Sequence, residues 1–384
     1  MLAPLPFTVF PNPRAGRPGI AVLPAGGFAR AKAEITRWQG YAPTPLRDLP
    51  ALAAEAGIAA LRYKDEAGRF GLGSFKSLGG AYAVAGVLAD QLARAGIAPA
   101  AGSADLAAGL YADATRRITV TCATDGNHGR SVAWGAQRFH CRCVIFVHET
   151  VSEGRIAAIA AYGAEIRRVP GTYDDAVAAA AHEAGENDWF VVSDTSWPGY
   201  TEIPRTIMQG YRLMPDEAAD QWSGPPPTHV FIQAGVGGAA AAVSVHMRAR
   251  FVPAPAIIVV EPDRAACLLA SAELGSLTTL PGALDTIQAC LACGEPSLLA
   301  WQELDRAAMA FVAIPDEAAI ACMRILAARH ITAGDSAVAG LAALLLAAAD
   351  PAARATLGLD AGSRVLLFGT EGATDPQLYR HLIR

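Results

Sequence analysis

Three lysines stand among the 31 basic residues of this chain, and one of them, Lys76, lies in the glycine-flanked stretch GLGSFKSLGG (71–80). A lysine amine can lose its proton and add to a carbonyl carbon to form a Schiff base, whereas a guanidinium group stays protonated. Lys76 is therefore a candidate nucleophile. The alternative is a general bias toward arginine that has left three lysines without special purpose.

A second candidate site is the glycine-rich stretch GVGGAAAA (235–242), which follows an apolar run and opens a helical one. Backbone N–H groups exposed by successive glycines, together with a helix N-terminus, favour an anion such as phosphate. Three interpretations stay open from the motif alone. Gly235, Gly237 and Ala240 fit a dinucleotide fingerprint, with Glu261 as the ribose-binding acid. The loop could equally hold a single phosphate, or only allow tight packing.

The stretch TDGNHGRS (124–131) also joins a strand-like run to a helical run. Asp125, Asn127 and His128 fall where ligands bind in open α/β sheets, at the carboxyl ends of strands. Asp125 is a candidate acid or base, and Asn127 a candidate hydrogen-bond partner. An Asx turn with Asn127 as the helix cap explains the Asn and Gly residues but does not require the Asp.

Two further strand-like runs end in polar residues. VVSDTSWPGY (191–200) places Asp194 beside Trp197 and Tyr200, where a carboxylate could bind an ammonium group. LLFGTEGATDP (366–376) places the Thr370 hydroxyl where it could reach a ring nitrogen. Ordinary turn chemistry also accounts for each residue. The combination is more specific than its parts, because an isolated lysine, a phosphate loop and polar strand ends are the components of a pyridoxal-phosphate site.

These candidates need elements that position them, and the chain supplies short β-like runs alternating with helical runs. This alternation predicts βαβ units and parallel sheets. Predicted strands cover 61–66, 118–124, 141–149, 164–169, 189–194, 228–234, 256–262 and 364–372. Predicted helices cover 74–96, with Ser74 as the cap, 127–139, 152–163, with Ser152 as the cap, 172–187, 235–250, 264–275 and 336–349. The stretch 97–115 reads as an exposed insertion.

Composition narrows the class of protein. With 384 residues, 52% hydrophobic and 17% charged, the chain can bury a large core. A net charge of −5 without a basic run argues against nucleic acid as a partner. We expect no membrane segment, no secretory signal and a cytoplasmic location. Seven scattered cysteines, including the CxxC pair Cys290 and Cys293, do not form a disulfide or zinc pattern, so no metal is expected.

With these residues in view, the chain resembles the tryptophan-synthase-β-like superfamily of fold type II pyridoxal-phosphate enzymes. More closely, it resembles the diaminopropionate ammonia-lyases. The resembling segments run in the family's order from about residue 61 to 376: YKDEAGRFGLGSFKSLGGAYAV, ATDGNHGRSVAWGAQ, SDTSWPGYTEIPRTIMQGY, PTHVFIQAGVGGAAA, IIVVEPDRAAC, TIQACLACGEP, GDSAVAGL and FGTEGATD. Departures are GVGG in the phosphate loop, Gly-Asp-Ser at 334–336 and the unmatched stretch 97–115.

The resemblance implies an α/β fold with two open, mostly parallel twisted sheets flanked by helices and the cofactor in the cleft between domains. The large cofactor-binding domain is expected at 1–79 and 195–384, with a smaller α/β domain inserted at 80–194. The expected partner is a small amino-acid substrate, and the expected assembly is a homodimer, as in most relatives of this fold.

The resemblance also implies a role for each candidate residue. Lys76 carries pyridoxal 5′-phosphate as a Schiff base and then takes the α-proton of an L-amino acid, while Asp125 is the base for the D enantiomer. Asp194, with Thr124, contacts the substrate and its ammonium group. Asn127 meets the ring hydroxyl and Thr370 the pyridine nitrogen. The phosphate contacts come from the loop residues Gly235, Val236, Gly237, Gly238 and Ala239.

The implied reaction is α,β-elimination of 2,3-diaminopropionate to pyruvate and ammonia. The nearest alternative is a serine, threonine or hydroxyaspartate dehydratase, which shares every cofactor residue and differs at Asp125 and Asp194. More distant alternatives are a nicotinamide-dependent oxidoreductase that uses Glu261 and a non-catalytic sensor of amino acids or cofactor.

Overall fold

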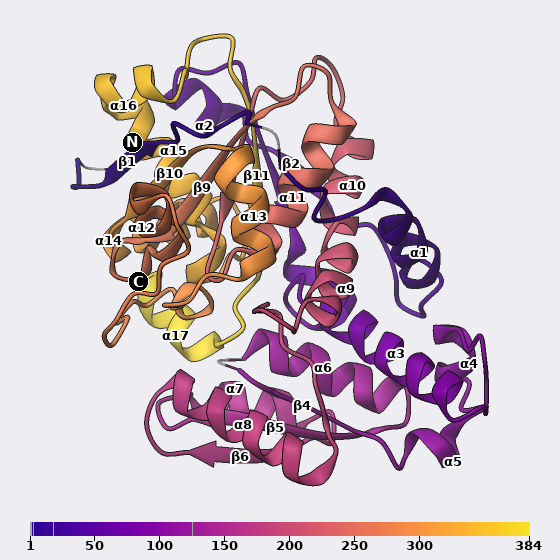
Figure 1. The fold of residues 1–384 in the computed structure, drawn as a ribbon. Coiled ribbons are helices and arrows are strands. Elements are labelled where there is room, and N and C mark those ends of the chain that lie inside the picture. The colour runs from indigo at the N-terminus through magenta and orange to yellow at the C-terminus, as the bar shows by residue number, and fades with distance from the viewer. Residues whose placement is uncertain (1, 3, 18, 125) are drawn as a thin grey trace. The chain divides into compact units, whose positions relative to one another are not determined.

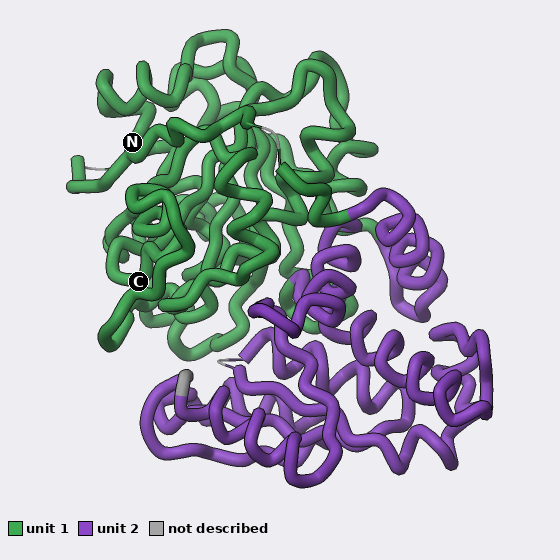
Figure 2. The backbone as a smooth tube through the Cα atoms, in the orientation of Figure 1, with its two compact units in different colours: residues 1–23, 43–74, 214–384 green, residues 24–42, 75–213 purple. Residues whose placement is uncertain are grey.

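The computed structural model describes residues 2, 4–17, 19–124 and 126–384. The chain divides into two compact units, coloured separately in Figure 2. Unit 1 comprises 1–23, 43–74 and 214–384, and unit 2 comprises 24–42 and 75–213. No helix among the described residues is both long and apolar enough to cross a membrane.

A seven-stranded sheet forms the centre of unit 1, in the order β1-β10-β9-β8-β11-β3-β2. The five inner strands run parallel, and the edge strands β1 and β2 run antiparallel to their neighbours. The strands are β1 (Thr8–Pro11), β2 (Leu46–Asp48), β3 (Ala60–Asp65), β8 (His229–Gln233), β9 (Ala256–Pro262), β10 (Ala308–Ile314) and β11 (Arg364–Gly369). Parallel strands are apolar along their length because helices cover both faces, and all five residues of β8 are buried.

Helices of unit 1 pack along this sheet, as Figure 1 shows. The most apolar of them, α15 (Ala339–Ala349), contacts β8, β9, β10 and β11. The others are α2 (Pro50–Glu55), α10 (Leu213–Gln221, with its first residue in unit 2), α11 (Gly238–Arg250), α12 (Cys267–Leu274), α13 (Leu298–Ala307), α14 (Asp316–Ala327), α16 (Pro351–Thr356) and α17 (Pro376–Leu382). Short 3-10 turns cover Glu66–Gly71, Asp263–Ala265, Ala289–Leu291 and Asp335–Ala337.

The sheet of unit 2 is fully parallel, in the order β6-β5-β4-β7. Its strands are β4 (Thr119–Ala123), β5 (Arg142–His148), β6 (Glu165–Val169) and β7 (Phe190–Val191). Ile145 packs toward α6 (Asn127–Arg138), whereas Val144 and Phe146 pack with α8 (Tyr173–Asn187). Alternate strand residues point to opposite faces, so α6 and α8 cover opposite faces of this sheet.

The remaining helices of unit 2 extend this layer. They are α1 (Ala25–Ile35), α3 (Ser77–Arg94), α4 (Ser103–Ala107), α5 (Ala112–Thr115), α7 (Glu153–Ala160) and α9 (Glu202–Tyr211). Helix α3 packs against α6 and α9, and α1 packs against α9. Ser152 caps α7 as predicted, because its hydroxyl accepts a hydrogen bond from the Arg155 N–H.

The α/β class and the two mostly parallel sheets are confirmed, while several boundaries differ. Helix α3 begins at Ser77, and Ser74 forms a β-bridge with Glu371 instead of capping the helix. The strand predicted at 189–194 is limited to β7. The sequence did not reveal β1 or β10; β10 follows α13 directly, without the turn residues that mark a boundary. The stretch 97–115 contains α4 and α5 and buries Leu106 and Thr115, so it is not simply exposed.

The compact units also differ from the predicted domain boundaries. Residues 24–42 group with unit 2, and the Trp38 indole donates a hydrogen bond to the Ser103 hydroxyl in the same unit at 2.8 Å. Residues 195–213 also group with unit 2, because α9 packs on α3. An inserted domain at 80–194 therefore omits two segments that pack with it.

Candidate active site

Lys76 is the N-cap residue of α3 in unit 2 and is mostly buried, with 17% of its side chain exposed. Its carbonyl oxygen accepts a hydrogen bond from the Ser131 hydroxyl of α6 at 2.8 Å. The Ser131 oxygen in turn accepts from the Ala81 N–H at 3.1 Å. These contacts attach the first turn of α3 to α6 and thereby fix the position from which the Lys76 side chain extends.

The glycines that follow Lys76 are required by close helix packing. A Cβ atom on Gly79 would lie 2.3 Å from Tyr211 Cε1 and 2.8 Å from the Ile207 carbonyl oxygen. On Gly80 it would lie 2.4 Å from Ser131 Oγ. Real Cβ atoms do not approach this closely, and overpacking of this kind strains the backbone. The Gly-Gly pair therefore brings α6 and α9 against the start of α3.

The Lys76 ammonium group forms a hydrogen-bonded ion pair with the Asp194 carboxylate, which is 12% exposed. Two aromatic rings also lie close to the Lys76 ammonium group. Lys76 Nζ lies 5.4 Å from the Phe75 ring centre and 5.6 Å from that of Tyr211, within the range of cation–π attraction. The lysine predicted as nucleophile and the carboxylate predicted to bind ammonium are thus in direct contact.

Electrostatics keep the Asp194 carboxylate charged. Burial by itself raises its pKa, but the Lys76 ammonium group, which also donates a hydrogen bond, holds the pKa of Asp194 far below its usual value. A carboxylate that is never protonated near neutral pH cannot donate a proton. It can bind a cation, and in this structure it binds the ammonium group of Lys76.

His128 lies on the other side of Asp194, with its Nδ1 3.7 Å from Asp194 Oδ2. Its Nε2 lies 2.7 Å from the Val192 carbonyl oxygen, which only accepts, so Nε2 carries the proton. Burial lowers the pKa of His128, an effect only partly offset by Asp194. The imidazole is therefore neutral at neutral pH, and Nδ1 is available as a proton acceptor.

The turn before α6 presents Asn127. The Thr124 hydroxyl oxygen accepts hydrogen bonds from the N–H groups of Gly126 and Gly129, both at 3.0 Å, which holds this turn in shape. Asn127 Oδ1 accepts from Arg130 Nη2 at 2.8 Å, and this orients the amide. Asp125 lies outside the described residues. Thr124, predicted to contact substrate, has a visible role in shaping the turn, and its substrate contact stays a prediction.

The predicted phosphate loop lies in unit 1 between β8 and α11. Gly237, the N-cap of α11, has φ +95°, a backbone conformation that favours glycine. A Cβ atom there would also lie 3.0 Å from Ala300 and 3.1 Å from Leu268. Gly237 has no side chain with which to cap α11. Since the first N–H groups of a helix have no acceptor within the helix, this terminus can bind an anion.

Thr370 lies at the end of β11 in the same unit, buried at 6% exposure. Its hydroxyl oxygen accepts a hydrogen bond from Gln233 Nε2 at 2.8 Å, and the same amide group donates to the Phe368 carbonyl at 2.8 Å. Because Thr370 is an acceptor in this contact, its own O–H remains a donor. A donor of this kind suits an unprotonated ring nitrogen. Gln233, which directs the hydroxyl, was not identified from the sequence, although a polar residue closing a buried strand is a usable signal.

Glu261 has a structural role that excludes the dinucleotide interpretation. Both of its carboxyl oxygens accept hydrogen bonds from the start of α12, from the N–H groups of Leu268 and Leu269 at 2.8 Å each. Burial raises its pKa to about 8. A ribose-binding acid must be free to accept hydrogen bonds from two hydroxyl groups, and Glu261 is fully buried.

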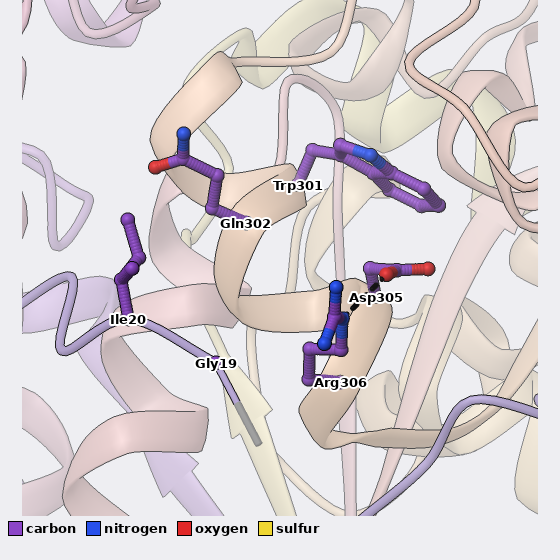
Figure 3. Close-up of a pocket in the computed structure, with 6 residues that line it drawn as sticks. All are labelled: Gly19, Ile20, Trp301, Gln302, Asp305 and Arg306. Atoms are coloured by element: carbon purple, nitrogen blue, oxygen red, sulfur yellow. Dashed lines mark hydrogen bonds and ion pairs between the residues drawn. The ribbon is translucent and has the colours of Figure 1, made fainter. Parts of the chain in front are cut away.

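A surface hollow of about 520 Å³ in unit 1 contains none of the predicted site residues. As Figure 3 shows, it lies between the N-terminal arm, at Gly19 and Ile20, and helix α13. Asp305 pairs with both Arg14 and Arg306. These contacts attach the arm to α13 and indicate a structural role.

Comparisons with known proteins agree with these features. The family described as pyridoxal-phosphate dependent enzyme matches residues 37–368. A diaminopropionate ammonia-lyase of Escherichia coli is 37% identical over 379 residues, which covers 93% of this chain and 92% of the relative. The chain belongs to the diaminopropionate ammonia-lyase family of pyridoxal-phosphate-dependent enzymes. Its cofactor is pyridoxal phosphate.

A second relative and two solved structures agree. A diaminopropionate ammonia-lyase of Salmonella typhimurium is 38% identical, covering 89% of this chain and 88% of its own length. The crystal structure of holo diaminopropionate ammonia lyase from Escherichia coli has a TM-score of 0.90 at 34% identity, covering 100% of this chain and 98% of its own. A second structure of that enzyme, in complex with D-serine, has a TM-score of 0.89 at 34% identity and covers 99% of this chain and 97% of its own.

The described residues fit the requirements of this cofactor. The amine of Lys76 suits the aldehyde, the glycine-initiated N-terminus of α11 suits the phosphate, and the Thr370 O–H suits the ring nitrogen. Tyr211 and Tyr200 are site residues that we did not assign from the sequence. Tyr211 lies beside Lys76 and Asp194, and burial raises its pKa, so it stays protonated. Nothing in the local pattern around residue 211 marks it.

Proposed function

We propose that this chain catalyses the α,β-elimination of ammonia from 2,3-diaminopropionate, with pyruvate and a second ammonia as final products. One observation carries the proposal most directly: the charged Asp194 carboxylate binds the ammonium group of Lys76, the candidate nucleophile itself. A substrate with a second amino group presents the same chemical species. When bound, pyridoxal phosphate supplies an electron sink that makes the α-proton acidic.

The residues then have separate tasks. Lys76 would hold the cofactor through its amine and would accept the α-proton of the L enantiomer. Asp125 accepts the α-proton of the D enantiomer. Asp194 holds the β-nitrogen as ammonium, so that this nitrogen leaves with the bonding electrons as neutral ammonia. The remaining three-carbon enamine is released and is hydrolysed by water to pyruvate and ammonia.

Other residues hold the cofactor in this proposal. The side-chain amide of Asn127, oriented by Arg130, donates to the ring hydroxyl oxygen. The backbone from Gly235 to Ala239 binds the phosphate, and Thr370 donates to the ring nitrogen. A neutral hydroxyl leaves that nitrogen unprotonated, which is sufficient for elimination. Thr124 keeps the turn before α6 in place and contacts the substrate.

The first experiment tests the cofactor. Purified protein should be yellow, and borohydride should attach the cofactor to the peptide that contains Lys76. Lys76→Arg is the sharpest variant, because arginine keeps a positive charge near Asp194 but cannot form a Schiff base. Lys32→Arg, a conservative change on α1, is the matched control and should keep both the colour and the activity. A colourless wild-type protein without a peptide adduct would contradict the proposal.

The second experiment tests the substrate. Pyruvate release is measured with D- and L-diaminopropionate, D- and L-serine and threonine. We expect both enantiomers of diaminopropionate to have the highest kcat/KM. Turnover of serine or threonine without turnover of either diamine would instead identify a dehydratase.

We also propose that the chain acts as a homodimer in the cytoplasm, an expectation that rests on resemblance alone. Light scattering of the purified protein tests the first part, since a dimer has twice the 39.8 kDa chain mass. Microscopy of a tagged copy in the source cell tests the second.

A further inference from the structure

The segment that carries Asp194 is folded around a single tyrosine. The Tyr200 hydroxyl donates a hydrogen bond to the Val191 carbonyl at 2.8 Å and accepts one from the Ser193 N–H at 3.0 Å. Its backbone forms a β-bridge with Trp197, and the two rings stack at 4.2 Å with an interplanar angle of 16°. One phenol oxygen therefore connects the end of β7 to the residue directly before Asp194.

The two residues next to these anchors, Val192 and Asp194, are held by other groups of unit 2. The Val192 carbonyl accepts from His128 Nε2, and its N–H donates to the Thr121 carbonyl of β4 at 2.8 Å. Asp194 follows Ser193 and pairs with Lys76. The chain from 191 to 194 is thus held at every residue, at 191 and 193 by Tyr200 and at 192 and 194 by the groups around the site.

The hydrogen bonds of Tyr200 leave its hydroxyl group no role in proton transfer. Burial raises the pKa of its phenol well above the usual value, so it stays protonated at every pH at which the protein works. Its hydroxyl hydrogen is already used in the contact with the Val191 carbonyl. Tyr200 therefore neither donates nor accepts a proton in catalysis, and its contribution must come through the backbone that it holds.

We propose that Tyr200 is a positioning residue that sets the direction of the Asp194 carboxylate and thereby the preference of the enzyme for a substrate with a second ammonium group. This inference rests on the proposed function of Asp194 as the ammonium receptor. A carboxylate that moves by less than an ångström loses the alignment of a charge-assisted hydrogen bond. Substrates without the second ammonium group do not use that bond.

The test is Tyr200→Phe in the cofactor-loaded enzyme. Phenylalanine keeps the ring that stacks on Trp197 and removes only the oxygen and its two hydrogen bonds. We expect kcat/KM for diaminopropionate to fall about tenfold, mostly through a higher KM, in line with the loss of one well-placed hydrogen bond. For serine we expect kcat/KM to change by less than about threefold. If the enzyme does not turn serine over, the inhibition constant of serine is measured instead. The colour and the borohydride label on Lys76 should not change.

A double-mutant comparison separates positioning from a general structural role. In an Asp194→Asn background, Tyr200→Phe should have little further effect on the diamine-to-serine ratio, because both changes act on the same contact. Tyr162→Phe, at another tyrosine of unit 2, is the matched control and should leave the ratio unchanged. If Tyr200→Phe does not fold, Trp197→Leu, which removes the ring stack, is expected to lower the same ratio.

The results that would overturn the positioning role of Tyr200 differ from those that would contradict the proposed function. A wild-type enzyme that does not act on diaminopropionate contradicts the function itself. Equal losses for diaminopropionate and serine, or an unchanged ratio in Tyr200→Phe, overturn the positioning role alone. Fully additive effects of Tyr200→Phe and Asp194→Asn do the same.

Discussion

Lys76 and Asp194 form a buried ion pair although 118 positions separate them in the chain. Lysine extends from the start of α3, and aspartate follows β7. The pair places an amine that can carry a cofactor directly against a carboxylate that can bind an ammonium group. The most specific predictions about this chain concern these two residues and the helices that hold them.

Asp194→Asn should raise KM for diaminopropionate at least tenfold. Asparagine keeps the size of the side chain but removes the charge, and a charge-assisted hydrogen bond is about twice as strong as a neutral one. Serine, which has no second ammonium group, should be affected much less. Steady-state kinetics on both substrates measure how much KM rises for diaminopropionate compared with serine. Asp188→Asn is the control, since Asp188 is exposed at the end of α8 with φ 56°, a conformation that asparagine tolerates.

Asp125→Asn should separate the two enantiomers of the substrate. If Asp125 is the base for D-diaminopropionate and Lys76 the base for the L form, turnover of the D enantiomer falls by roughly 100-fold or more, the usual contribution of a general base. Turnover of the L enantiomer should fall much less. Pyruvate release from each pure enantiomer measures this. Equal losses of turnover for the two enantiomers would argue for one shared base. Asp113→Asn, at an exposed site, is the control for the substitution itself.

Gly79→Ala should destabilise the protein strongly. The new methyl group would lie 2.3 Å from Tyr211 Cε1, so α3 and α9 must separate, at a cost of about 1–3 kcal/mol or more. Gly86→Ala on the same helix is a matched control, because its Cβ would meet only Thr206 Cγ2, at 3.8 Å. That change should be neutral or stabilise by up to about 1 kcal/mol. Thermal unfolding of both variants gives the comparison, and equal melting temperatures would contradict it.

Glu261 should make stability depend on pH. Burial raises its pKa to about 8 in the folded chain, against about 4.3 when unfolded. Its stabilising contribution is therefore complete below about pH 4 and is lost as pH rises toward 8, because the unfolded chain gives up the proton first. Relative to Glu261→Gln, the wild type should lose on the order of 3 kcal/mol between pH 5 and pH 8. Denaturant unfolding at each pH measures this difference.

The control for this prediction is Glu273→Gln, on the same helix that Glu261 caps but at an exposed position. This variant shows what a Glu→Gln change on α12 does without the buried hydrogen bonds of Glu261. A difference between Glu261→Gln and wild type that does not change with pH would mean that the Glu261 carboxyl group titrates normally, stabilised as an anion by the two N–H groups of α12.

Much of the fold followed from local pattern. Strand and helix runs from 118 to 169 and the helix cap at Ser152 could be predicted because apolar periodicity and capping chemistry are local properties. Strand β10 could not, since an apolar run that continues directly from a helix has no boundary signal. The grouping of the segment 24–42 with unit 2 has no local signal either, because it depends on distant contacts such as that of Trp38 with Ser103.

By itself, the sequence determined the chemistry available: an isolated amine at Lys76, a glycine loop for phosphate and polar residues at strand ends. Residue type and short spacing are sufficient for that inference. Only the tertiary structure decided which alternatives survive. It assigned Glu261 to a helix cap, joined Lys76 to Asp194 and connected Asp194 to Tyr200. The start of α3, which presents Lys76, packs against α6 and α9 closely enough to exclude a methyl group at Gly79 and Gly80, and no local pattern encodes that distance.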